Sequence, residues 1–259
     1  MAVIGAILGD ISGSQYEFSR PKDLDTEHCE LFTKKCEFTD DTVLTLAVKH
    51  AITNGLPFAD TIRDFARRYP RSGYGERFIR WMLSTNAEPY NSFGNGSAMR
   101  CSFIGEHFDT ENEVSLWAAR SAECTHSHPE GVKGAVVTAM CVYMARTGAS
   151  KEEIFKYTAK NYPKSDYKYS PEYKLEEYRN SYEWNEICQD SVPVAVRCFL
   201  ESEDYTSFLR NVYSLPCDMD TICAIGGGIA EEFYHGTGFD DNKLLKEYLD
   251  EYLYGILRS

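Results

Sequence analysis

The chain has 259 residues, enough for a substantial core, and hydrophobic and aromatic residues make up 43% and 14% of it. This composition excludes a disordered chain and fits one large domain or two small ones. The net charge of −13, without any basic stretch, argues against general nucleic-acid binding, because phosphate contacts need clustered Lys and Arg. A small phosphorylated ligand is not excluded, since metal ions and backbone N–H groups bind phosphate on acidic proteins.

The cysteines and the N-terminus indicate where the protein resides. Nine cysteines are scattered through the chain without a CxxC pair, and several lie in apolar helical stretches, where a thiol acts as a small hydrophobe. This pattern argues against a disulfide framework or a zinc site. The first apolar stretch meets Asp10 after eight residues and lacks a basic region. We therefore predict a cytoplasmic protein without a membrane span.

Helical periodicity dominates the chain. Apolar residues at helical spacing predict helices over residues 3–8, 43–52, 62–69, 135–143, 192–200 and 222–234. The first is expected to lead into a Gly9-Asp10 turn and a small-residue loop, whereas Pro70, Gly148 and Gly236 mark later helix ends. Alternating strand patterns are absent. The predicted fold is all-α, a single compact multi-helix domain over residues 1–259.

One segment differs from this helical pattern. The segment from about Pro163 to Glu183 is rich in Tyr, Lys and Glu, and six tyrosines lie in or next to it, at positions 162, 167, 169, 173, 178 and 182. Such a composition is typical of a solvated excursion from the domain. We predict that this segment is exposed, and it is a candidate cover for a site.

Two short acidic segments carry the strongest chemical signal. Thr39-Asp40-Asp41-Thr42 and Asp218-Met219-Asp220-Thr221 each place two carboxylates beside a hydroxyl. Oxygen ligands of this kind suit hard divalent cations such as Mg²⁺, Mn²⁺ or Ca²⁺. If the fold joins the two segments, they form a centre for one or two ions. Alternatively they cap helices, because each precedes an apolar helical stretch, and the two roles are compatible.

Two further segments are unusual for plain helix packing. Residues 93–100, Phe-Gly-Asn-Gly-Ser-Ala-Met-Arg, form a glycine-rich stretch that runs into a helical pattern. Such a loop lets backbone N–H groups approach an anion, although an ordinary tight turn has the same composition. Residues 125–130 place His126 and His128 just before a helix, where one histidine is commonly a cap and two could also contact a ligand.

In this order the segments resemble the ADP-ribosylglycohydrolase family, which includes the dinitrogenase-reductase-activating glycohydrolases. The resemblance extends from Gly5 to about Gly236 and rests on GAILGDxxGSxYEF, FTDDT, GYGERFIRW, SFGNGSAMR, THSHPEGVKGA, CQDSVPVA and DMDT. It implies an all-α domain with a divalent-metal centre in a cleft that holds ADP-ribose.

The resemblance also implies roles for individual residues. The metal ligands, expected to hold two Mg²⁺ ions with Mn²⁺ as the alternative, are Thr39, Asp40, Asp41, Asp218, Asp220 and Thr221. Glu17, Asp40 and Asp41 are the expected catalytic carboxylates. The expected ADP-ribose contacts are Phe93, Gly94, Asn95, Gly96, Ser97 and one or both of His126 and His128. One departure concerns Pro216-Cys217, which replaces the family's usual Gly-Gly and alters the backbone path available there.

The predicted function is Mg²⁺-dependent hydrolysis of the glycosidic bond between ADP-ribose and a modified acceptor, by a monomer that binds neither nucleic acid in general nor membranes. The acceptor is predicted to be arginine or another, unassigned group. Two alternatives stay open at this point: a non-catalytic structural or ADP-ribose-binding member of the same fold, and a metal-dependent nucleotide phosphatase. All six expected ligands are present, which disfavours the first alternative.

Overall fold

The computed structural model describes residues 1–85 and 88–259, and within these residues the secondary structure is helical, with no β-strand beyond one isolated bridge between Gly94 and Ile187. The predicted all-α class is confirmed. The helices are α1 Ala2–Ser14, α2 Asp40–Asn54, α3 Phe58–Arg68, α4 Glu76–Leu83, η1 Asn95–Ser97 (a 3₁₀ turn), α5 Ser102–His107, α6 Glu111–Glu123, α7 Pro129–Arg146, α8 Lys151–Asn161, α9 Leu175–Ser181, α10 Cys188–Leu200, α11 Tyr205–Tyr213, α12 Met219–Tyr234, α13 Asp241–Tyr248 and α14 Glu251–Arg258.

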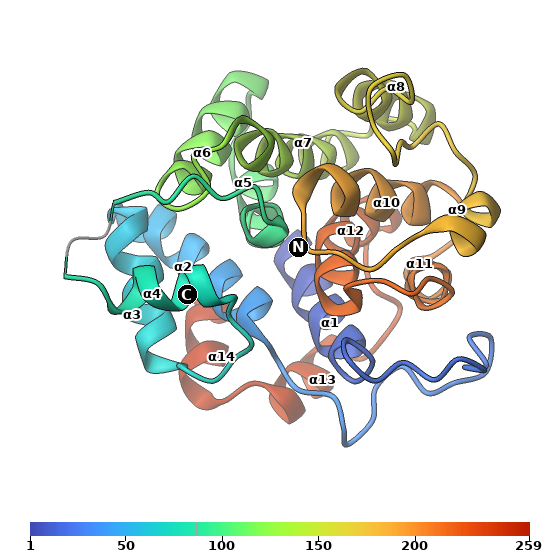
Figure 1. Ribbon diagram of the computed structural model, residues 1–259. Helices are drawn as coiled ribbons and strands as arrows, with labels where there is room; N and C mark the ends of the chain where they lie inside the picture. Colours follow the sequence, from blue (N-terminus) through green and yellow to red (C-terminus); the bar gives the residue numbers. More distant parts are fainter. Residues whose placement is uncertain (86–87) are drawn as a thin grey trace.

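Helices α1 and α12 pack against each other in the middle of the molecule (Figure 1). Two glycines of α1 allow the backbones of α1 and α12 to come into contact. A Cβ built on Gly9 would lie 2.2 Å from the carbonyl oxygen of Cys223, and one built on Gly13 would lie 2.5 Å from the Cα of Asp220. Larger side chains at these positions would force the helices apart. The contact therefore brings Asp10 close to the first turn of α12, which carries Asp220.

The remaining helices surround this central pair. Helices α2, α3 and α4 lie on one side of it and α9, α10 and α11 on the other, while α5, α6 and α7 cover a third side (Figure 1). Helices α2 and α12 begin at Asp40 and Met219, so each predicted acidic segment lies at a helix start. None of the helices in the described residues combines the length and the apolar character of a membrane span.

The N-terminal region differs from the prediction. We expected a turn at Gly9-Asp10 followed by a loop, but α1 continues without interruption to Ser14. The expectation was wrong because glycine was interpreted as a turn residue. In the structure Gly9 and Gly13 lie on the face that contacts α12, where close packing outweighs their low helix propensity.

The tyrosine-rich segment is also different from the prediction. Tyr162, Tyr169, Tyr178 and Tyr182 are at most 5% exposed, and part of the segment forms α9. Their rings contact one another, as in the pair formed by Tyr169 and Tyr182, whose centroids are 4.6 Å apart. The segment is therefore part of the core rather than a solvated excursion. Its Lys and Glu residues misled the prediction because they occupy only the outer face.

Candidate functional site

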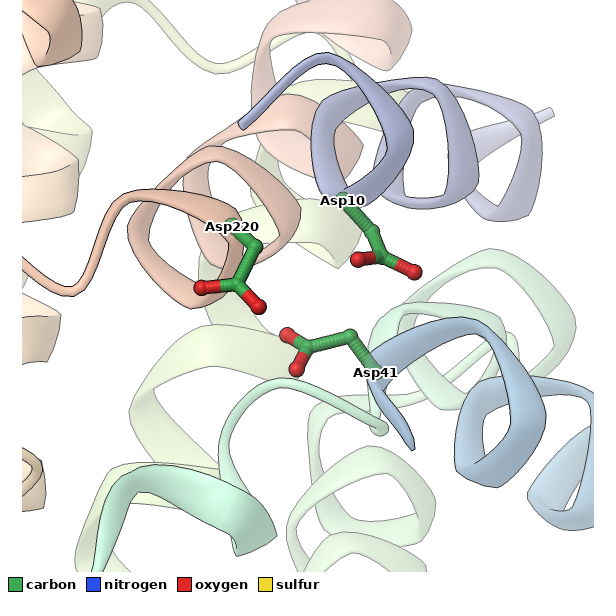
Figure 2. Close-up of side chains that lie close together, drawn as sticks. All are labelled: Asp10, Asp41 and Asp220. Carbon is green, nitrogen blue, oxygen red and sulfur yellow. The ribbon is translucent and has the colours of Figure 1, made fainter. Parts of the chain in front are cut away.

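Three carboxylates from three different helices meet at the centre of the molecule. Asp10 comes from α1, Asp41 from the first turn of α2 and Asp220 from the first turn of α12, and Figure 2 shows their side chains pointing toward one another. One oxygen from each lies within 4.8 Å of the others, and none of the three residues is more than 2% exposed. Buried carboxylates this close repel one another unless positive charge compensates them.

A second carboxylate group shares Asp220 with the first. Glu17, Asp218 and Asp220 also place one oxygen each within 4.8 Å of one another. Glu17 is half-buried in the stretch that follows α1, whereas Asp218 is 4% exposed at the start of α12. The five residues of the two groups, Asp10, Glu17, Asp41, Asp218 and Asp220, are called the acidic cluster below.

Asp10 fixes the start of α2. Its carboxylate accepts hydrogen bonds from the backbone N–H groups of Thr39 and Thr42, both at 3.0 Å, and from their hydroxyl groups at 2.7 and 2.5 Å. The Thr39 hydroxyl in turn accepts a bond from the backbone N–H of Asp41 at 3.3 Å. The first acidic segment is therefore a helix cap that also orients Asp41 toward the cluster.

The second acidic segment is held differently. Asp218 precedes α12 but makes no capping bond with its side chain. Instead its Oδ2 accepts a hydrogen bond from the Asn95 side-chain amide at 2.7 Å, and the same amide donates to the Ser191 hydroxyl at 3.0 Å. The Thr221 hydroxyl donates to Oδ2 of Asp41 at 3.2 Å and links the two acidic segments. The cap interpretation thus applies to the first segment only.

Burial raises the pKa of every carboxyl group in the acidic cluster. It raises the pKa of Asp10 to about 6 and that of Asp218 to about 7, and burial together with repulsion from Asp220 raises the pKa of Glu17 to about 9. The pKa of Asp41 rises well above its ordinary value through burial and the charge of Asp220, and that of Asp220 through burial and the charge of Asp218.

The acidic cluster has the chemistry of a cation site. Oδ1 of Asp41 and Oδ1 of Asp220 are buried and have no hydrogen-bond partner in the described residues. Unsatisfied buried acceptors are costly in an apolar interior, and a divalent cation would satisfy them while offsetting the mutual repulsion. Oxygen atoms alone favour Mg²⁺, Mn²⁺ or Ca²⁺ over softer metals.

A pocket of about 270 Å³ opens beside the acidic cluster. Glu17, Asp41, Asp218 and Asp220 line one part of it. Four residues that we call the basic side line another part: Arg77, Tyr90, Arg100 and His126. The Arg77 guanidinium lies 5.1 Å from the centre of the Tyr90 ring, and the Tyr90 and His126 rings are 6.0 Å apart. The pocket therefore presents carboxylates and guanidinium groups to the same enclosed space.

The glycine-rich loop joins these two parts of the pocket. Gly94, Asn95 and Gly96 line the pocket, and Asn95 holds Asp218 as described above. A Cβ built on Gly96 would lie 3.4 Å from Nε2 of His126, so the small residue leaves room beside the imidazole. Ser97 is fully buried instead, and its hydroxyl donates to the carbonyl oxygen of Gly131 at 2.7 Å.

The two histidines occupy different environments. His126 is 5% exposed and lines the pocket. His128 lies outside the pocket lining, at the N-terminus of α7, where its Nδ1 accepts a hydrogen bond from the backbone N–H of Glu130 at 3.1 Å. Phe93 is likewise outside the lining, 39% exposed, with its ring 5.1 Å from that of His128. Of the two histidines, the geometry therefore favours His126 for contact with a ligand.

The other predicted site residues also have defined positions. Asp40 is half-buried and lines the pocket beside Gly73, but its carboxylate is not one of those grouped in the acidic cluster. Thr39 is buried and its hydroxyl is used in the cap, whereas Thr221 lines the pocket. Cys217 is 3% exposed, and burial raises the pKa of its thiol well above the ordinary value, as expected for an inert thiol.

Sequence analysis missed two parts of this site. Asp10 was interpreted as a turn residue, although Gly9 and Gly13 at helical spacing around it could have indicated a helix-packing face. Arg77 and Arg100 were not singled out, because an arginine in a helical sequence is most often exposed. Arg100 lies in the SFGNGSAMR segment, and its place next to a glycine-rich loop was the available signal.

The fold and the site together define a class: helical proteins whose pocket holds a candidate divalent-cation centre. The family model for ADP-ribosylglycohydrolase matches residues 1–230. The chain therefore belongs to the ADP-ribosylglycohydrolase family, as the sequence motifs predicted.

Individual relatives agree with this assignment. The chain is 27% identical to ADP-ribosylhydrolase ARH3 of Mus musculus, over 89% of this chain and 82% of the mouse protein. It is 24% identical to a putative ADP-ribosyl glycohydrolase of Acanthamoeba polyphaga mimivirus, over 91% of this chain and 86% of the viral protein. A solved structure titled "ADP-ribosylglycohydrolase-related protein complex" shares the fold, with a TM-score of 0.73 at 21% identity, and the match covers 98% of this chain and 93% of that one.

Proposed function

We propose that this protein is a divalent-metal-dependent hydrolase that cleaves the glycosidic bond between ADP-ribose and a modified acceptor. The observation that carries the proposal is the pair of unpartnered buried oxygens, Oδ1 of Asp41 and Oδ1 of Asp220, beside a pocket with a basic side. A cation at these oxygens and an anionic ligand opposite them would satisfy both parts of the pocket. ADP-ribose combines ribose hydroxyl groups with an anionic diphosphate and meets both demands.

Hydrolysis at a ribose anomeric carbon proceeds through a transition state with oxocarbenium character. The residues proposed to hold one or two Mg²⁺ ions are Thr39, Asp40, Asp41, Asp218, Asp220 and Thr221, joined by Asp10. A bound divalent cation orients ribose hydroxyl groups and lowers the pKa of water. Glu17 lies at the edge of the acidic cluster and would exchange a proton with the attacking water or the leaving group.

The glycine-rich loop and the basic side would receive the rest of the ligand. Gly94 and Gly96 leave their backbone accessible in the pocket, and Arg77 and Arg100 supply positive charge for the diphosphate. His126 would contact the same part of the ligand.

The acceptor would lie toward the pocket edge near Glu17. Phe18 and Trp184, which are 76% and 46% exposed, place their rings 6.5 Å apart. Phe18 follows Glu17 and Trp184 lies two residues before Glu186, and both glutamates line the pocket. This surface is where an acceptor side chain would contact the protein.

The test is release of ADP-ribose from peptides that carry it on arginine or on serine, with Mg²⁺ and with EDTA. We expect metal-dependent release from at least one peptide, and the preferred linkage identifies the acceptor. Release of inorganic phosphate from ADP-ribose or a nucleotide, without cleavage of either peptide, would instead support a phosphatase. Calorimetric titration with ADP-ribose completes the test, because binding without any turnover would indicate a non-catalytic binding protein.

A further inference from the structure

Arg100 is a fully buried arginine without an acidic partner. Its side chain is 0% exposed, yet it forms no ion pair with the described residues. Its Nη2 donates to the carbonyl oxygen of Ser121 at 2.8 Å and to the Thr125 hydroxyl at 2.9 Å. Burying a guanidinium that is held only by neutral oxygens costs free energy. The position of Arg100 beside the pocket therefore needs an explanation.

The bond from Arg100 restricts what the Thr125 hydroxyl can do. A guanidinium only donates hydrogen bonds, so the Thr125 oxygen must be the acceptor of that bond. The single hydroxyl hydrogen of Thr125 then points to one of two neighbours. These are Nδ1 of His126 at 2.7 Å and the carbonyl oxygen of Ala122 at 3.5 Å. The contact with Nδ1 forms whichever of the two atoms donates, but the carbonyl oxygen of Ala122 already accepts the backbone N–H groups of Thr125 and His126 at 3.0 and 2.7 Å. If Nδ1–H were the donor, the hydroxyl hydrogen would be left with the 3.5 Å contact to this occupied carbonyl. The hydroxyl is therefore the donor to Nδ1.

The hydroxyl hydrogen in turn determines the tautomer of His126. Because Nδ1 accepts this bond, it carries a lone pair, and the ring proton of the neutral imidazole is on Nε2. Nε2 makes no hydrogen bond to the part of the chain that the structure describes, and it faces Gly94 and Gly96, whose added Cβ atoms would lie 3.6 and 3.4 Å from it. The donor therefore points into the pocket.

We propose that Arg100 and Thr125 are positioning residues that fix His126 as a neutral Nε2–H donor, directed at an oxygen of the bound ligand. The opposite tautomer would present a lone pair to that oxygen and repel it. This inference rests on the proposed function for the identity of the ligand, which is the diphosphate or a ribose of ADP-ribose. The tautomer itself follows from the protein alone.

The surroundings of His126 keep the imidazole neutral. Burial lowers its pKa well below the usual value, and the positive charges of Arg100 and Arg77 lower it further. A neutral imidazole can exist as either tautomer, so a further interaction is needed to select one. The Thr125 hydroxyl supplies that selection.

The test compares the wild type with Thr125→Val, which removes the hydroxyl at nearly constant volume, and Thr125→Ser, which keeps it. Nitrogen-15 NMR of the imidazole in the ligand-free protein reports the tautomer. We expect the Nε2–H form in the wild type and in Thr125→Ser, and a mixture of tautomers in Thr125→Val. Affinity for ADP-ribose should fall roughly tenfold in Thr125→Val and stay within about twofold in Thr125→Ser.

Other results would overturn the proposal. An unprotonated Nε2 in the wild type would contradict it directly, and so would a Thr125→Val variant with unchanged tautomer and affinity. Thr125→Ala replaces Thr125→Val if the latter does not fold. A wild type that shows the Nε2–H form but binds no ADP-ribose would leave the positioning device standing and refute the proposed function instead.

Discussion

The acidic cluster and the basic side of the pocket carry opposite charges that do not pair with each other. The acidic cluster contains two buried oxygens without partners, and Arg100 likewise has Nε and Nη1 without partners in the described residues. Most buried charges in proteins neutralise one another. Here the separation of the two charges is maintained by Asn95, which holds Asp218, and by Thr125, which accepts from Arg100.

This difference between the two sides indicates what each can bind. The buried oxygens of the acidic cluster would accept a cation, and the donors of the basic side would accept an anion. A ligand bearing an anionic diphosphate, bound together with a divalent cation, would complete both at once, whereas a collapsed ion pair between the sides would prevent binding. The unfavourable electrostatics of the free pocket are therefore consistent with preorganisation for such a ligand. The predictions below alter one side at a time.

The largest effect is expected from Asp41→Asn and Asp220→Asn. Changing only the outer partners of metal ligands costs roughly 10–100-fold, so losing a direct ligand should reduce turnover by more than about a hundredfold. The metal-free thermal midpoint should not fall, because burial and neighbouring carboxylates disfavour the charged form of each of these groups, as their raised pKa values indicate, and the neutral amide avoids that cost. Release of ADP-ribose and thermal unfolding in EDTA measure the two effects. Asp64→Asn, at an exposed position of α3, is the control. Unchanged turnover in both variants would refute the metal centre.

Removing the metal should reproduce this loss without any mutation. We expect EDTA to abolish turnover, and Mg²⁺ or Mn²⁺ to restore it. A cation at about 100 times its Kd should also stabilise the wild type by about 2.7 kcal/mol. Asp220→Asn should show little of this gain. Thermal shift at constant ionic strength checks the stabilisation, and full activity after dialysis against EDTA would contradict the proposed metal dependence.

The sequence predicted the acidic side of the pocket much better than the basic side. Asp41, Asp218 and Asp220, three of the proposed ligands, lie in two contiguous four-residue segments, so their chemistry can be recognised locally, and Glu17 was predicted through the family resemblance. Asp10 was the exception, because its role depends on the packing of α1 against α12, which no local pattern reveals. On the basic side the sequence predicted His126 but not Arg77, Tyr90 or Arg100. These residues come from separate parts of the chain, and only the fold brings them together.

The fold shows the same contrast between local and non-local information. The predicted long apolar helices are present, since a stripe at helical spacing must be buried. Helices α4, α6, α8, α9, α11, α13 and α14 were not predicted. Most of them are short, and α6 and α8 are rich in charged residues, so their stability depends on neighbouring elements. The tyrosines around α9 were assigned to the surface because the Lys and Glu residues between them indicate an exposed segment, whereas they occupy only its outer face.

A smaller effect, on stability, should distinguish Asp10 from Asp218. Truncation to alanine leaves a similar cavity at each position. However, Asp10→Ala also removes the acceptor for four hydrogen bonds at the start of α2, whereas Asp218→Ala removes the acceptor for one. Each buried donor left unsatisfied costs about 1–3 kcal/mol. We expect Asp10→Ala to lose at least about 2 kcal/mol more than Asp218→Ala in urea denaturation with EDTA. Equal losses would mean that Asp10 does not anchor α2.

The smallest effect concerns the basic side and its dependence on pH. The folded protein keeps His126 neutral because its pKa is lowered well below the usual value by burial and by Arg100 and Arg77. The unfolded chain takes up a proton at this residue near pH 6.5, so below that pH the unfolded state binds more protons and acidification favours it. Relative to His126→Gln, the wild type should lose up to about 1.4 kcal/mol of unfolding free energy for each pH unit below about 6.5.

Urea denaturation between pH 7 and 5 measures this difference, in which the contributions of the acidic cluster are common to both proteins and cancel. His107→Gln is the matched control, because His107 is exposed and its surroundings change less on unfolding. We expect the unfolding free energy of the wild type and of His107→Gln to fall more steeply with decreasing pH than that of His126→Gln. This result would establish that the imidazole of His126 is held neutral in the pocket. Parallel pH profiles of the wild type and His126→Gln would mean that the imidazole accepts a proton in the folded state. A protonated ring carries hydrogens on both nitrogens, so the Thr125 hydroxyl would then have no tautomer to select.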